Sequence, residues 1–155
     1  MLRFGANAHN FTLDAEQELG TPLDELFPFF ADAKNLQTLT PEFLSFEIKT
    51  PLPVTMREGA LIDYRIKLRI IPMTWRTHIA VWEPPLRFVD EQLKGPYTLW
   101  RHEHRFVARG DRTLVIDHVD YKVPFGGLLN KLLVQPDLET IFTYRQAKMA
   151  ELFGA

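Results

Sequence analysis

The stretch of sequence that decides the fold is Arg87–Phe106, which reads RFVDEQLKGPYTLWRHEHRF. Its pattern predicts two antiparallel strands joined at Lys94–Tyr97, where Gly95 and Pro96 interrupt two runs that alternate. Successive side chains of a strand point to opposite faces of the sheet. The residues predicted to share one face are Phe88, Asp90 and Gln92 on the first strand and Trp100, His102, His104 and Phe106 on the second. An aromatic face that also carries imidazoles, a carboxylate and an amide indicates a lined cavity.

The same alternation predicts further strands at residues 9–19, 43–49, 61–71, 73–82 and 112–123. Two short helices are expected after the first strand, one from Pro22 and one over about 29–37, because Pro28 interrupts a longer helix. The C-terminal segment has five residues at the spacing of one helix face: Leu138, Ile141, Phe142, Arg145 and Met149. Pro136 is expected either to kink this helix or to separate a lead-in at about 128–134 from a main helix at about 136–153.

This order predicts an α+β protein in which a curved, seven-stranded antiparallel sheet carries its helices on one face. With 155 residues, the chain is expected to form a single domain over residues 1–155. One amphipathic helix cannot fill the concave side of such a sheet. Either bulky side chains or a ligand must therefore occupy the remaining space.

Composition narrows the classes of function. The chain has 18 basic and 20 acidic residues and a net charge of −2, and it has no basic stripe of the kind that binds nucleic acid. It has no cysteine, so disulfides and thiolate sites are excluded. Residues 1–7 lack the apolar core of a signal peptide, and no apolar run is long enough for a membrane span. A cytoplasmic protein is expected.

Four segments resemble a bacterial subfamily of the START/Bet v 1-like superfamily, which is also known as the SRPBCC or polyketide cyclase/dehydrase-like group. They are Asn35–Leu44; Trp75–Ile79 with Trp82–Pro85; Phe88–Gln92 with Gly95–Tyr97 and Trp100–Phe106; and Tyr121–Pro124 with Phe142–Arg145. The resemblance implies a helix-grip fold, with a deep hydrophobic cavity between the sheet and a long C-terminal helix. Members include lipid carriers, hormone receptors and aromatase/cyclases, so the resemblance implies a site but no particular reaction.

The residues predicted to bind a ligand are Tyr64, Trp75, Phe88, Asp90, Gln92, Trp100, His102, His104, Phe106, Asp117, Tyr121 and Phe142. Catalytic candidates are His102, His104 and Asp90, since a buried histidine beside a carboxylate can be poised for proton transfer near neutral pH. The same residues could hold a metal. The favoured interpretation is that the two histidines line a polar end of the cavity and form hydrogen bonds with Asp90, Gln92, Asp117 or Tyr121, and neither a metal nor a cofactor is predicted.

Three hypotheses about function remain open. The first is non-catalytic binding, as a carrier or sensor, of a small hydrophobic or lipid-like molecule. The second is a cyclase, aromatase or dehydratase that uses a His/Asp acid–base pair. The third is an interaction protein whose own side chains fill the cavity. Arg145 either anchors the last helix or faces an acidic group of the ligand, and an edge strand could support a homodimer.

Overall fold

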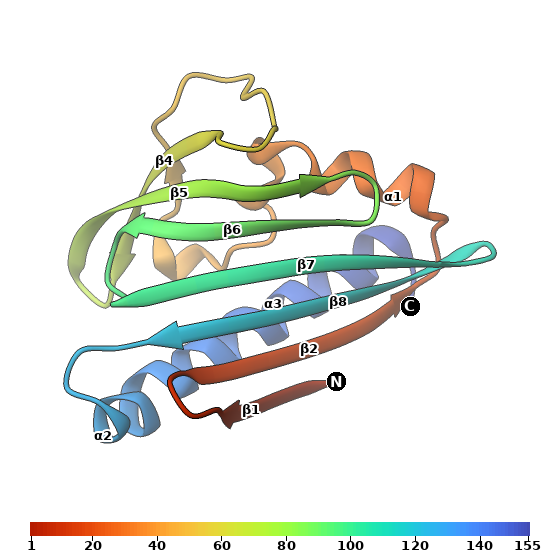
Figure 1. Cartoon of the computed structure of the whole chain (residues 1–155). Helices are drawn as coiled ribbons and strands as arrows, with labels where there is room; N and C mark the ends of the chain where they lie inside the picture. Colours follow the sequence, from red (N-terminus) through yellow and green to blue (C-terminus); the bar gives the residue numbers. More distant parts are fainter.

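The structure is a computed structural model that describes all residues from Met1 to Ala155. Its sheet has eight strands in the order β1-β2-β8-β7-β6-β5-β4-β3, and every neighbouring pair is antiparallel. The strands are β1 (Leu2–Ala6), β2 (Phe11–Leu19), β3 (Glu47–Ile48), β4 (Leu61–Leu68), β5 (Ile71–Glu83), β6 (Arg87–Lys94), β7 (Leu99–Arg109) and β8 (Arg112–Lys122). Figure 1 shows them side by side, with the helices on one face.

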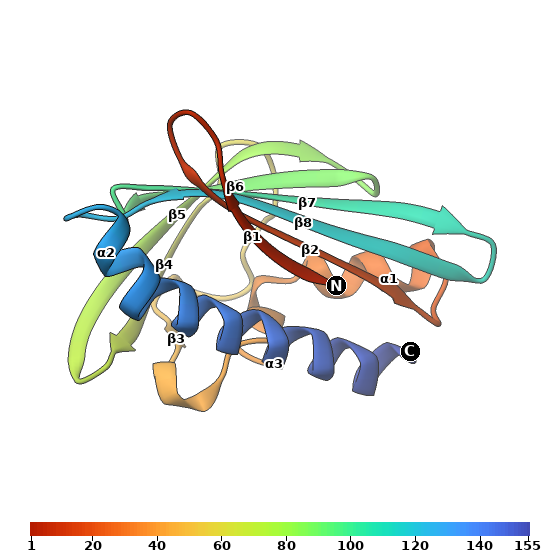
Figure 2. The same ribbon diagram turned by 90° about the horizontal axis from the view of Figure 1, so that it is seen from below.

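The helices are α1 (Leu23–Phe30), α2 (Gly127–Leu129) and α3 (Gln135–Phe153). Two 3₁₀ turns at Ala33–Leu36 and Glu42–Leu44 follow α1, and a π-helical turn at Asn130–Val134 joins α2 to α3. Figure 2 shows the sheet curling downward at β4 and β5, with α3 running along its concave side. None of the helices has the length and apolar character needed to cross a membrane.

The central hairpin confirms the prediction made from Arg87–Phe106. Strands β6 and β7 pair so that Phe88 lies opposite His104 and Asp90 lies opposite His102. All four side chains therefore belong to the face of the sheet that α3 covers. The next hairpin turns at Gly110, which has a φ of 66°, a left-handed conformation that glycine adopts without strain.

Strand β8 has apolar side chains on both faces, so its alternation alone does not show which face is buried. Its inward residues are Thr113, Val115, Asp117, Val119 and Tyr121, all of which are buried. A carboxylate in the middle of this row is unusual, because a buried charge is costly unless it is paired. The partners of Asp117 come from β7 and α3, as described below.

Several predicted elements are corrected. The sheet has eight strands rather than seven, because Leu2–Ala6 forms an additional edge strand, β1, that pairs with the first half of β2. Helix α1 continues through Pro28, and the expected second helix is only the 3₁₀ turn Ala33–Leu36. The second alternative for Pro136 is confirmed: a lead-in of α2 and the π turn, Gly127–Val134, precedes the main helix α3, and Pro136 lies in the first turn of α3. The wider π turn before it avoids the clash that proline makes with a carbonyl one turn earlier.

The apolar core has two parts. One surrounds α1 and includes Phe27, Phe30 and Phe106 with Met149 of α3. The other lies between the curled part of the sheet and the first half of α3, and includes Trp75, Trp100 and Phe142. The first part is closed by the aromatic side chains of α1, whereas the second contains the cavity.

Candidate functional site

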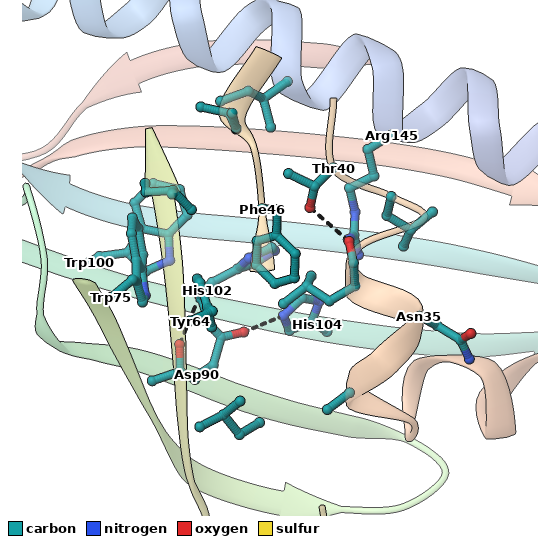
Figure 3. A pocket seen from close by; sticks show the side chains of 18 of the residues that line it. Asn35, Thr40, Phe46, Tyr64, Trp75, Asp90, Trp100, His102, His104 and Arg145 are labelled. Atoms are coloured by element: carbon teal, nitrogen blue, oxygen red, sulfur yellow. Dashed lines mark hydrogen bonds and ion pairs between the residues drawn. The ribbon is translucent and has the colours of Figure 1, made fainter. Parts of the chain in front are cut away.

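A cavity of about 200 Å³ lies between the sheet, helix α3 and the segment from Phe29 to Phe46 (Figure 3). Twenty of its 29 lining residues are hydrophobic, so it favours a ligand with a mostly apolar surface. An apolar cavity of roughly 150 Å³ is large enough to bind benzene. The space here therefore suits a compact molecule of one or two rings.

Aromatic side chains form one wall of the cavity. Trp75 and Trp100 meet edge to face with ring centroids 5.6 Å apart, and Tyr64 stacks on Trp75 at 5.9 Å. The hydroxyl of Tyr64 lies 2.9 Å from the Thr77 hydroxyl. Because that hydroxyl already has a protein partner, and because burial raises the pKa of Tyr64 far above its usual range, Tyr64 stays neutral and contributes mainly its ring.

A buried network of imidazoles and carboxylates forms the polar wall. His102 Nε2 lies 2.8 Å from Asp117 Oδ1, and His104 Nε2 lies 2.6 Å from Asp90 Oδ2. His104 Nδ1 is also 3.1 Å from Asp117 Oδ1. The two imidazoles stack with centroids 3.7 Å apart. Both rings are held by carboxylates from neighbouring strands, so the network fixes their orientation.

The surroundings shift the two histidines in opposite directions. Burial and the neighbouring imidazole of His104 lower the pKa of His102. Burial also acts to lower the pKa of His104, but hydrogen bonds to Asp117 and Asp90 outweigh it and raise that pKa. The neutral His102 then donates from Nε2 to Asp117 and keeps a lone pair on Nδ1. A base and an acid therefore stand next to each other.

Helix α3 contributes Arg145 to the same wall (Figure 3). Its guanidinium packs 5.6 Å from the Phe30 ring centroid, and its Nη2 lies 3.6 Å from Asp117 Oδ1, too far for a hydrogen bond. Burial opposes ionisation of Asp117, but Arg145 and the two histidines hold the pKa of that carboxyl well below its usual range. Asp117 is therefore an anion at neutral pH, and it links β8 to both β7 and α3.

Most of the predicted ligand-binding residues lie in the cavity lining: Tyr64, Trp75, Phe88, Asp90, Trp100, His102, His104 and Phe142. The other four lie elsewhere. The Gln92 amide bridges the backbone of Tyr97 across the hairpin turn, and Phe106 packs against Phe27 and Phe30 under α1. Asp117 is behind the histidines, and the Tyr121 hydroxyl donates to Asn130 Oδ1.

The sequence-based list missed part of the lining. The segment from Phe29 to Phe46 supplies ten of these residues, among them Ala33, Leu36, Leu39 and Thr40. Its irregular turns show no periodicity, so nothing in the sequence indicated which side chains point inward. Ile141 and Arg145 also line the cavity. Both belong to the predicted inward face of α3, so this face could have been used to predict them.

The oxygen of Asp90 and the nitrogens of His102 and His104 lie within 4.8 Å of one another, close enough to consider a metal. However, Nε2 of each histidine already bonds to a different carboxylate. A metal bound through both Nε2 atoms would have to break both bonds. His102 Nδ1 is free, but each nitrogen of His104 already faces a carboxylate, and the charge of Arg145 beside them opposes a cation. The geometry suits hydrogen bonding and proton transfer better.

The fold and the site together define a class of protein: an antiparallel sheet curled around a C-terminal helix, with a ligand-sized apolar cavity between them. Residues 19–149 match the family described as polyketide cyclase / dehydrase and lipid transport. The chain belongs to this family, and the resemblance to the START/Bet v 1-like superfamily is confirmed. No protein with a curated function matches the chain.

Solved structures show the same fold. An aromatase/cyclase from Streptomyces sp. R1128 is 13% identical with a TM-score of 0.71, over 91% of this chain and 92% of that one. A START superfamily protein from Mycobacterium smegmatis is 17% identical with a TM-score of 0.66, over 91% and 98%. Norcoclaurine synthase from Thalictrum flavum is 16% identical with a TM-score of 0.65, over 95% and 98%. At these identities the likeness concerns the fold alone.

Proposed function

We propose that this protein binds a small hydrophobic molecule in the cavity between the sheet and α3, and carries or senses it. The observation behind this proposal is an apolar space of about 200 Å³ with aromatic walls on one side and a fixed polar wall on the other. Each 100 Å² of apolar ligand surface removed from water contributes about 2.5 kcal/mol, from which the cost of association must be subtracted. The polar wall would set the orientation of the ligand.

Native mass spectrometry of freshly purified protein, compared with the denatured mass, tests this proposal. We expect a bound small molecule that Ala33→Leu excludes, because Ala33 lines the cavity and leucine adds three carbon atoms there. Ala147→Leu on the exposed face of α3 is the matched control, and it should keep the ligand. Retention of the ligand by Ala33→Leu would place binding elsewhere.

A second candidate function is supported by the imidazole pair. His102, oriented by Asp117 and neutral, could take a proton on Nδ1 from a carbon next to a ligand carbonyl and then return it to another atom of the ligand. His104, whose two nitrogens face Asp90 and Asp117, would keep its own proton. Proton transfer of this kind by His102 suits cyclisation or dehydration. The extracted ligand, incubated with the stripped protein, should then change in mass or retention time, and His102→Phe should abolish the change while retaining binding. A ligand recovered unchanged would support carriage.

A further inference from the structure

Among the buried polar atoms of the cavity lining, those without a hydrogen-bond partner are all nitrogens. They are Trp75 Nε1, His104 Nδ1, Arg145 Nε and Arg145 Nη2. No oxygen of a lining side chain is left in this way. His104 Nδ1 has the Asp117 carboxylate 3.1 Å away. The groups that still lack an acceptor are therefore N–H donors of Trp75 and Arg145.

Arg145 is the stronger of these donors. Its residue is only 6% exposed, its Cζ lies 5.6 Å from the centroid of the Phe30 ring, and its Nε and Nη2 have no hydrogen-bond partner in the protein. A buried donor that finds no acceptor costs more than an average hydrogen bond gains. A ligand oxygen placed at this end of the cavity would remove that cost.

The charges around Arg145 indicate whether the ligand oxygen that it binds is charged or neutral. His104 Nε2 lies 2.6 Å from Asp90 and its Nδ1 lies 3.1 Å from Asp117, so a carboxylate faces each ring nitrogen, an arrangement that favours the protonated imidazole and raises its pKa. Two carboxylates then stand against the imidazolium of His104 and the guanidinium of Arg145, and the cluster is neutral without a ligand. A ligand carboxylate would leave one uncompensated negative charge in a buried site, which is costly. An uncharged acceptor satisfies the donors and keeps the balance.

We propose that Arg145 forms a subsite for an uncharged oxygen acceptor such as a ketone or ester carbonyl, and that the cavity selects such ligands over both carboxylates and hydrocarbons. Trp75 lies on the other side of the cavity (Figure 3) and takes no part in this subsite. This inference rests on the proposed binding function. It replaces the alternative in which Arg145 pairs with an acidic group of the ligand.

Three naphthalenes of matched shape test the subsite: 2-acetylnaphthalene, 2-isopropenylnaphthalene and 2-naphthoate. They differ in whether the branch carries a carbonyl, a methylene or a carboxylate. Equilibrium dialysis against the stripped protein at pH 7 gives the three dissociation constants. We expect the ketone to bind at least about tenfold more tightly than the hydrocarbon, the size expected of a hydrogen bond to a charged donor, and more tightly than the carboxylate.

In Arg145→Met the preference for the ketone over the hydrocarbon should fall to about twofold or less, because the donor of the subsite is removed. Arg105→Met, whose arginine lies on the outer face of the sheet, should keep the full preference. If Arg145→Met fails to fold, the double variant Asp117→Asn with Arg145→Met removes one charge of each sign and gives the same comparison.

The outcomes separate the two proposals. Equal affinity for the ketone and the hydrocarbon would mean that water satisfies Arg145, and this inference would be wrong although binding in the cavity stands. Tighter binding of 2-naphthoate would mean that Arg145 reads an anion. Failure of all three compounds to bind would overturn both the proposed binding of compact ring molecules and this subsite.

Discussion

Replacing Asp117 by asparagine removes the charge that links the two histidines to helix α3. Asp117 is 2% exposed, with His102 Nε2 at 2.8 Å, His104 Nδ1 at 3.1 Å and Arg145 Nη2 at 3.6 Å from the same oxygen. Removing one partner from a buried ion pair costs about 3–5 kcal/mol. The lower end applies here, because an asparagine oxygen can still accept from His102 and because His104 can lose its proton.

We therefore expect Asp117→Asn to lower the free energy of unfolding by about 3 kcal/mol. For a chain of this length that corresponds to a melting temperature roughly 6–12 °C lower. Urea unfolding followed by circular dichroism at pH 7 gives the free energy directly. Asp63→Asn is the matched control, since Asp63 pairs with Arg76 at 2.8 Å in contact with water; its effect should be far smaller.

The pH dependence gives a second check on the same variant. The pKa of Asp117 is well below its usual range in the folded protein, so the carboxylate stabilises the fold above the unfolded pKa of about 4. That contribution is lost as the pH falls through the folded value. The difference between wild type and Asp117→Asn should be constant near neutral pH and shrink in acid. A loss below about 1 kcal/mol at pH 7, the size of an exposed ion pair, would refute the coupled buried cluster.

Three further predictions concern neighbouring residues. Nitrogen NMR should find His104 protonated at a pH where His102 is neutral with its proton on Nε2, and equal titration of both rings would contradict this. Because folding raises the pKa of His104, the stabilising effect of its charge is present below the unfolded pKa and is lost as the pH rises through the folded value. Tyr121→Phe leaves the buried Asn130 oxygen without its donor and should cost about 1–3 kcal/mol, with faster amide exchange in the π turn, whereas unchanged exchange there would argue against the bond. Phe142→Ala should cost about 3 kcal/mol in urea unfolding and enlarge the cavity; a cost below 1 kcal/mol would mean that α3 does not pack there.

The sequence predicted the parts of the fold that depend on local periodicity. The alternation from Phe88 to Phe106 placed the two histidines and Asp90 on one face, and the structure has them there. The face of α3 was likewise correct, since Leu138, Phe142, Arg145 and Met149 are buried and Ile141 is partly buried. These patterns were predictable because burial of one face of a helix or strand determines the spacing of the apolar residues within that element.

What the sequence could not predict depends on distances between elements. Strand β1 was missed because it has only five residues and gains its place by pairing with β2. Phe106 shares its face with His104 but lies beyond the cavity, under α1. Asp117 of β8 meets Arg145 of α3. The inward face of α3 was predictable, whereas the inward face of β8 and the curvature of the sheet that brings the two residues together were not.

The proposed function depends most on the apolar space between the curled sheet and α3. Diffraction from a crystal of the protein pressurised with xenon measures that space directly, since xenon enters apolar cavities of this size. We expect xenon density bounded by Trp100, Phe142 and Leu36, side chains of the cavity lining. A crystal in which side chains close this space, with no xenon between the sheet and the helix, would contradict the account.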